Sequence, residues 1–243
     1  MGTLINVLAI LGGATLGVLL GNRLPEKMSR TLTDAMGLVV LVIGALNLFS
    51  LQDSDFVAAV GAAGTLLVVL GALLIGGIAG SLIGIDERLN QFGAWLQRKT
   101  SKAATGDKER FIQGFVNASL LFTIGPMAVL GALQDGLGQG FDVLALKSTL
   151  DGFTAIAFAA TLGWGVAFSA LPVGIWQGLL YVMALFLGAS LSQAVIAAIT
   201  ATGGILLLGT GLRVLQIRMV NVADLLPALV VAPLLVLLVD FLL

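Results

Sequence analysis

The chain contains no cysteine and no histidine among its 243 residues, and only one tyrosine. Without cysteine there is no disulfide and no thiol nucleophile, and without histidine no imidazole proton switch. Zinc and haem sites built on these two residue types are excluded as well. The His-Glu-x-x-His and Gly-x-Ser-x-Gly motifs of common hydrolases are absent. We therefore predict a protein that is not an enzyme and that has no catalytic residues, no metal site and no cofactor.

Charge is also scarce. Charged residues make up 10% of the chain, hydrophobic residues 58%, and the mean hydropathy is +1.09. Soluble domains carry about 25% charged residues, so this chain could not cover a water-exposed surface. The net charge of −1 gives no sign of nucleic-acid binding. The composition indicates an integral membrane protein whose main partner is the lipid bilayer.

Long apolar runs set the fold class, because spans of about 17–25 residues are typical of helices and not of β-barrels. We predict an all-α polytopic protein with about eight transmembrane helices, forming a single transmembrane domain over residues 1–243. The first run follows an N-terminus without a basic region, so we expect it to remain as a span. The eight apolar segments are 4–21, 33–50, 58–84, 112–133, 149–170, 173–189, 195–212 and 225–242.

Basic residues predict the orientation. They concentrate between spans one and two, three and four, and seven and eight, whereas the loop after span two carries only Asp53 and Asp55. The positive-inside rule then places both termini outside the cytoplasm. Residues 85–111 form a cytoplasmic loop, which we expect to begin as an amphipathic interfacial helix and to continue as a flexible tip.

An internal repeat is suggested by an offset of 167 residues, which aligns spans one to three (1–84) with spans six to eight (171–243). The central spans four and five (112–170) lie between the two copies. The loop after span two is acidic and its counterpart after span seven is basic, so the copies would be inverted, as in many secondary transporters. The alternative is a chance match of two glycine-rich helices. The aligned pairs are Gly21 with Gly188, Thr33 with Thr200, Gly37 with Gly204, Leu41 with Leu208, and Gly44 with Gly211.

Small residues recur every four positions in two spans. Such faces allow helix backbones to approach closely in lipid, so we interpret them mainly as packing surfaces. Some of them could form a homodimer interface, which the sequence does not distinguish from packing within the chain. The two faces consist of Gly13, Gly17 and Gly21 in span one, and of Ala72, Gly76, Gly80 and Gly84 in span three.

Span four contains the clearest interruption of an apolar run. Gly125 and Pro126 lie near its middle, and proline removes a backbone donor and clashes with the preceding turn, so we predict a broken helix. Broken membrane helices occur where the freed backbone groups line a polar cavity. Asn117, Ser119 and Thr123 precede the break and would bind substrate there. The alternative is a kinked span whose hydroxyls bond back to their own helix.

A second group of polar residues follows at the outer end of spans four and five. Asp135 is either a loop residue or part of an outer gate. Lys147 and Asp151 are four residues apart, so they share a helix face and could pair. Ser148 and Asp151 also fit a capping box, which leaves capping and a functional pair as alternatives for Asp151. Elsewhere, Asn6 and Gln177 are uncharged polar groups in short spans, where interhelical hydrogen bonding is the main alternative to substrate contact.

The strings NASLLFTIGPMAVLGALQDG, LKSTLDGFTAIAFA, ATGGILLLGTGLRVL and NVADLLPAL resemble the YdfK/YqgA-type family of bacterial inner-membrane proteins, catalogued as domain of unknown function 554. The similarity extends from the opening GTLIN to the LLPA segment before the last span. It implies a multi-pass protein of the bacterial cytoplasmic membrane, without indicating a substrate or a mechanism.

The leading functional hypothesis is a secondary transporter or channel-like permease for a small solute or ion. Its site would lie at the broken span four and the start of span five. The alternative is a non-transporting scaffold or sensor subunit of the membrane, in which packed side chains would fill the break.

Overall fold

The computed structural model describes every residue except 22–24, 101–104, 125, 188–191 and 243, and within these limits the chain is entirely helical. The elements follow in the order α1 (Gly2–Gly21), α2 (Glu26–Asn47), η1 (Leu48–Gln52), α3 (Ser54–Val60), α4 (Ala62–Ile83), α5 (Ile85–Thr100), α6 (Thr105–Thr123), α7 (Pro126–Gly136), α8 (Asp142–Leu162), α9 (Gly165–Phe168), α10 (Ala170–Leu187), α11 (Gln193–Val214), η2 (Val222–Leu225) and α12 (Ala228–Leu242), where η denotes a 3-10 helix.

Seven helical segments in the described part of the chain are long and apolar enough to cross a membrane. An eighth span results if α6 and α7 are counted together, and these two helices are bent by 61° at the break between them. The predicted all-α class is therefore confirmed, with seven to eight candidate spans. The break also lies where Gly125 and Pro126 predict it, and Pro126 is the first residue of α7.

Two span boundaries were wrong in the sequence-based prediction. The segment predicted at 149–170 is α8, which already begins at Asp142 and ends at Leu162. Gly163 then adopts a left-handed φ of 75° and separates α8 from α9 and α10. The prediction started too late because Lys147 and Asp151 interrupt the apolar run, although both lie inside the helix.

Helix α1 packs along α8, and the two helices run in the same direction. A Cβ atom at Gly13 would lie 2.3 Å from the Gly152 carbonyl oxygen, and one at Gly17 would lie 2.3 Å from the Ile156 carbonyl oxygen. The offset is constant, so the helices are parallel. Chain direction reverses with each crossing, and α2, α4 and the α6–α7 pair separate α1 from α8. Their parallel packing is therefore the arrangement expected if α6–α7 crosses the membrane and does not return to the side from which it started.

The predicted small-residue faces serve packing within the chain. The glycines of α1 are covered by α8, and a Cβ at Gly76 of α4 would lie 2.3 Å from the Ala228 nitrogen of α12. Gly84 instead ends α4 in a left-handed conformation with φ 69°. These faces are thus occupied by helices of the same chain, which is the packing alternative that the sequence left open.

Helices α2 and α11 cross at a contact to which both helices contribute glycines. A Cβ at Gly44 would lie 2.8 Å from the Gly204 carbonyl oxygen, and a Cβ at Gly211 would lie 3.2 Å from the Gly37 carbonyl oxygen. Later residues of α2 thus meet earlier residues of α11, so these helices are antiparallel. Small residues allow this close backbone approach, and α11 is the most deeply buried of the candidate spans.

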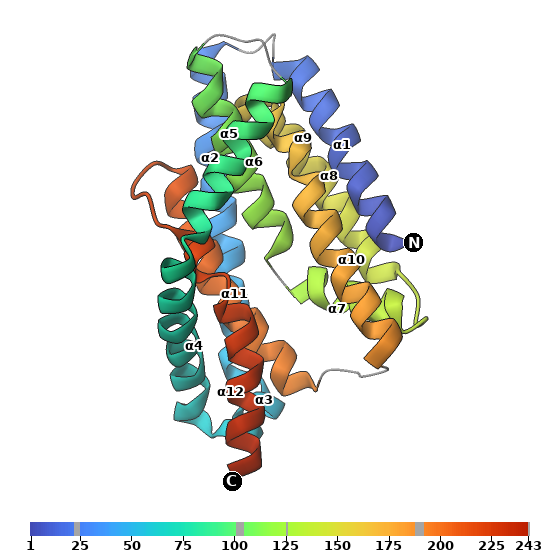
Figure 1. The fold of residues 1–243 in the computed structure, drawn as a ribbon, viewed down its shortest axis with the longest axis vertical. Coiled ribbons are helices and arrows are strands. Elements are labelled where there is room, and N and C mark those ends of the chain that lie inside the picture. Colours follow the sequence, from blue (N-terminus) through green and yellow to red (C-terminus); the bar gives the residue numbers. More distant parts are fainter. Residues whose placement is uncertain (22–24, 101–104, 125, 188–191, 243) are drawn as a thin grey trace.

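Figure 1 shows the helices in two groups. One group contains α2, α4, α11 and α12, and the other contains α1, α7, α8 and α10, with α6 between them. Within the groups, α11 packs against α2 and α12, whereas α1 packs against α8 and α10. Helix α5 is amphipathic, as predicted for the start of the 85–111 segment, and packs against α6.

Candidate functional site

The centre of the candidate site is an ion pair inside α8. The Lys147 Nζ atom donates to Asp151 Oδ2 at 2.5 Å, and the two side chains are only 8% and 10% exposed. At a rise of about 1.5 Å per residue, Asp151 lies roughly 13 Å into the helix from its first residue, Asp142. The predicted pairing of these residues is confirmed. We call Lys147 and Asp151 the α8 ion pair.

A third residue joins this pair from another helix. Asn6 of α1 is fully buried, and its Nδ2 atom donates to Asp151 Oδ2 at 3.0 Å. Asp151 Oδ2 therefore accepts from one charged and one neutral donor. The Asn6 Oδ1 atom has no hydrogen-bond partner among the described residues. Asn6 thus forms the interhelical hydrogen bond that the sequence left as one of two alternatives.

The capping-box interpretation of Ser148 is wrong. The N-cap of α8 is Phe141, and Ser148 lies in the second turn, where its hydroxyl donates to the Leu144 carbonyl oxygen at 2.6 Å. An N-cap residue lies immediately before the first helical turn, whereas Ser148 is the seventh residue of α8. The side chain is buried and satisfies its own hydrogen bond, so it does not bind Asp151 as a cap.

A cavity of about 540 Å³ adjoins the α8 ion pair. It lies between the two groups of helices, and residues of α2, α6, α7, α8 and α11 line it. Lys147 and Asp151 are the charged residues of this lining, which is otherwise mostly apolar, and Asn47 and Thr154 add polar groups. From Lys147 to Phe158 the wall formed by α8 extends over roughly 16 Å. We call this space the first cavity.

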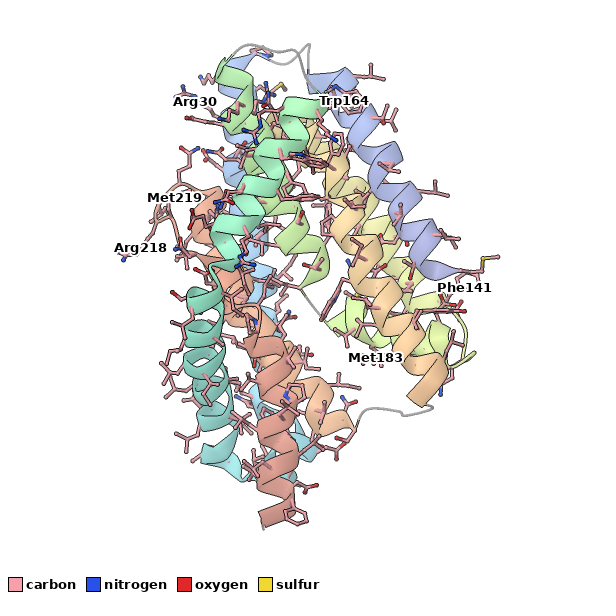
Figure 2. The ribbon with its side chains drawn as sticks, in the orientation of Figure 1. Arg30, Phe141, Trp164, Met183, Arg218 and Met219 are labelled. Carbon is pink, nitrogen blue, oxygen red and sulfur yellow. The ribbon has the colours of Figure 1, made fainter. Side chains whose placement is uncertain are left out.

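The first cavity opens sideways, through residues on the outer surface of the helices. Val39, Leu150 and Phe153 line it and are 57%, 52% and 70% exposed. These large apolar side chains lie in the middle of spans, where the surrounding medium is hydrocarbon. Phe141 and Trp164, both labelled in Figure 2, flank the two ends of α8 and are exposed. Exposed aromatic residues at both ends of a span are typical of the two membrane interfaces.

Ser119 and Thr123 do not face the α8 ion pair. They line a second cavity of about 500 Å³, bounded by α5, α6, α10 and α12. Their hydroxyls donate at 2.6 Å to the carbonyl oxygens of Phe115 and Ser119, respectively. This is the back-bonding that the sequence left open as the alternative. The predicted single constellation is therefore divided between two cavities on different sides of α6.

Other predicted residues near the break have different surroundings. Asn117 is buried, and its Oδ1 atom has no partner among the described residues. Gln177 of α10 is fully buried, with neither Oε1 nor Nε2 bonded to any described residue. Buried amides are normally hydrogen-bonded to protein or to water. Gly125 lies outside the described residues, and Pro126 is placed only as the start of α7.

Asp135 does not belong to an outer loop, and it is absent from the lining of the first cavity. It lies in the last turn of α7, where its Oδ2 atom accepts at 2.9 Å from both the Met1 amine and the Gly2 amide. A carboxylate at the start of a helix compensates the unpaired N–H groups there. Asp135 therefore fixes the beginning of α1 and does not form a gate with Lys147.

A second buried ion pair was missed by sequence reasoning. Arg213, in the last turn of α11, donates from Nη1 to Asp86 Oδ1 at 2.8 Å, and the side chains are 8% and 11% exposed. Asp224 of η2 accepts from the Asp86 amide at 2.8 Å. The only signal was that Arg213 directly follows an apolar run. We call Arg213 and Asp86 the α11 ion pair.

Within the described part of the chain, no group of three or more histidine, cysteine, aspartate or glutamate side chains is arranged to hold a metal ion. The chemistry available at the first cavity is therefore that of an ammonium, a carboxylate and an amide beside an apolar wall. These groups can bind a charged or polar molecule and exchange a proton.

Comparison with known proteins agrees with the resemblance of the sequence. The chain is 31% identical to the uncharacterized membrane protein YdfK of Bacillus subtilis (strain 168) over 234 residues, which cover 96% of this chain and 93% of the relative. It is 34% identical to the uncharacterized protein YqgA of Escherichia coli (strain K12) over 235 residues, or 96% and 94% of the two chains. No solved structure matches it significantly. Residues 1–237 match the family described as "Protein of unknown function (DUF554)", and the chain therefore belongs to this family of multi-pass membrane proteins.

Proposed function

We propose that this protein is a secondary transporter whose site is the first cavity. The observation that carries the proposal is a buried Lys–Asp pair on the wall of a cavity, beside a broken helix. Ionisable groups inside membrane spans are costly, and they typically mark substrate or ion pathways. A buried ion pair often stabilises a fold no more than apolar side chains of similar volume, so folding alone is a weak explanation for the α8 ion pair.

An inverted repeat is part of the proposal, and the contacts of α2 with α11 support it. The offset of 167 residues that relates Gly37 to Gly204 and Gly44 to Gly211 also relates the contacts themselves. Gly44 meets Gly204, and the related pair Gly211 and Gly37 meet in turn. Such reciprocity is expected if the two helices are related by a twofold axis in the membrane plane.

The neighbours of these glycines extend the same relation. Gly44 approaches Leu208 just as Gly211 approaches Leu41, and Leu208 is the counterpart of Leu41 at this offset. The antiparallel direction of α2 and α11 agrees with inversion. We infer that a shift at this crossing would close the first cavity on one side and open it on the other.

The proposed site combines three residues with distinct roles. Lys147 and Asp151 bind the charged part of the substrate, and Asn6 positions the Asp151 carboxylate from α1. Ser119 and Thr123 line the second cavity, across α6 from the ion pair, where they would line a separate part of the path. Asn117, whose buried Oδ1 atom is unbonded among the described residues, would bind substrate near the break. We further propose that the protein lies in the bacterial inner membrane with both termini outside the cytoplasm, as the basic loops predict.

Cysteine accessibility tests the proposal without knowledge of the substrate. The chain has no natural cysteine, so single variants need no altered background. Asn47→Cys and Ala157→Cys place thiols at different depths of the first cavity, and Leu74→Cys is a lipid-facing control that is 58% exposed in α4. A charged thiol reagent reacts only with a hydrated thiolate.

We expect labelling of Asn47→Cys from the outer side and of Ala157→Cys from the cytoplasmic side, with Leu74→Cys unlabelled. Crosslinking α2 to α8 across the cavity should abolish one of the two reactions. Absence of labelling at both cavity positions from either side would contradict transport through this cavity and favour the scaffold hypothesis. Simultaneous access from both sides would instead indicate a channel.

A further inference from the structure

The substrate class follows from the shape and charge of the first cavity, if the proposed transport role is correct. We propose that the cavity binds an amphiphilic monoanion, whose charged group replaces Asp151 on Lys147 while Asp151 takes up one proton. The acidic group could be a carboxylate or a phosphate diester, because both carry one negative charge and present anionic oxygens to an ammonium group.

The apolar part of this assignment rests on the lining. Apart from the α8 ion pair and a few polar groups, the wall consists of aliphatic and aromatic side chains such as Val40, Phe122 and Leu207. An elongated space of this kind matches an acyl or alkyl chain. Its mouth lies between Val39 and Phe153, on the hydrocarbon-facing surface, so the ligand can enter from the lipid.

The anionic part rests on Lys147. An ammonium group has three donors, and among the described residues only Asp151 is bonded to it. The Phe122 ring lies 6.0 Å from Nζ and adds no acceptor oxygen. Lys147 therefore has donors available for an anionic group that reaches the end of the cavity.

Charge balance supplies the proton. The α8 ion pair is neutral as a unit, and an added anion would leave one uncompensated negative charge in a medium of low polarity. Uptake of one proton from the aqueous phase by Asp151 restores neutrality, so one anion and one proton would move together. The Asn6 Oδ1 atom is buried and unbonded to any described residue, so it can accept the new O–H of Asp151 after rotation of the amide.

Among the described residues that line the cavity, Lys147 and Asp151 are the titratable groups, and the ammonium group of Lys147 already carries its proton. The lining residues of α2, α6, α7 and α11 are uncharged, and α1 presents Asn6 to Asp151. Asp135 of α7 is engaged with the first residues of α1. Asp151 is thus the acid–base group of the first cavity.

The experiment uses the whole chain in zwitterionic nanodiscs, with octanoate and the diester methyl octyl phosphate as probes. Octylammonium and octanol serve as ligands without negative charge. Binding is measured by the rise in Tm, and proton uptake by the dependence of the calorimetric binding heat on the ionisation heat of the buffer. We expect octanoate, methyl octyl phosphate or both to raise Tm, with about one proton taken up per ligand bound.

Variants of the ion pair separate the two parts of the inference. Lys147→Gln should weaken binding roughly tenfold or more, because a charge-assisted hydrogen bond is lost. Asp151→Asn should retain anion binding but abolish proton uptake. If Lys147→Gln alone fails to fold, the neutral double variant Lys147→Gln/Asp151→Asn replaces it in the test, and it should lose both anion binding and proton uptake. Thr149→Ala, on the exposed face of the same helix, is the control and should behave as wild type.

Equal binding of octylammonium, unchanged octanoate affinity in Lys147→Gln, or anion binding without proton uptake would overturn the inference. Selective binding of one anionic probe would identify its acidic group as the relevant one. The cysteine experiment uses neither probe. If the anionic probes do not bind but the cysteine variants are labelled, only the substrate class is rejected. If the cysteine variants are not labelled, the transport role is rejected.

Discussion

Two buried ion pairs among the described residues differ in how far apart their partners lie in sequence and in what surrounds them. Lys147 and Asp151 are one turn apart on α8 and line a cavity. Arg213 and Asp86 are 127 residues apart and join the end of α11 to the start of α5. The first pair lies on a single helix, whereas the second connects two helices. The comparison teaches that burial of charge alone does not identify a functional site, and that the adjoining space must be considered as well.

The neighbours of the two pairs strengthen this contrast. The α11 ion pair is held by further contacts, since Arg213 also donates to the Val220 carbonyl oxygen and Asn90 donates to Asp86 Oδ2 at 2.8 Å. Asp151 has one additional donor, Asn6, and an otherwise apolar cavity beside it. We therefore interpret the α11 ion pair as structural and the α8 ion pair as the site.

The largest expected effect comes from breaking the α11 ion pair. Arg213→Met leaves Asp86 buried without its counter-ion and should lower the free energy of unfolding by about 3–5 kcal/mol. An unfolding titration in mixed micelles measures this loss. Arg218→Met removes the same charge from an exposed position, labelled in Figure 2, and should change the free energy of unfolding by less than about 0.5 kcal/mol. Comparable effects of the two substitutions would refute the structural role of Arg213.

A smaller loss of stability is expected at the α8 ion pair. Asp151→Asn removes the counter-ion of Lys147, but that side chain borders a cavity, which can admit water, and can extend toward the outer interface. The free energy of unfolding should fall by about 1–3 kcal/mol in the same titration. Function should be affected more than folding. A loss of stability as large as that of Arg213→Met, with normal cavity access, would make the α8 ion pair structural as well.

The smallest effect is predicted for Ser148, next to the α8 ion pair. Its hydroxyl bonds back to the carbonyl oxygen of Leu144, so Ser148→Ala should change the free energy of unfolding by no more than about 0.5 kcal/mol. A capping residue would instead contribute about 1 kcal/mol. Thermal unfolding of this variant beside Thr149→Ala, which removes an exposed back-bonding hydroxyl, distinguishes the two values. A clear loss confined to Ser148→Ala would reveal a role that its contacts do not explain.

Several local features could be predicted from sequence. The proline in span four predicted the break, and the spacing of Lys147 and Asp151 predicted their pairing, because both depend on neighbours within about one helical turn. The start of α8 could not be predicted equally well, since an ion pair inside a span has the same local pattern as a polar helix end. Likewise, the side of α6 on which Ser119 and Thr123 lie depends on its rotation relative to other helices.

The sequence by itself determined that the protein lies in a membrane, that it is helical, and where its spans are interrupted. These properties follow from hydropathy and backbone chemistry, which act over a few residues. Only the tertiary structure decided which polar groups meet. Asn6 reaches Asp151 across 145 residues, and Gly2 reaches Asp135 across 133. In lipid, apolar helix faces are nearly equivalent, so close packing at glycines and a few polar contacts select the partners. Those contacts form only when the helices are already side by side.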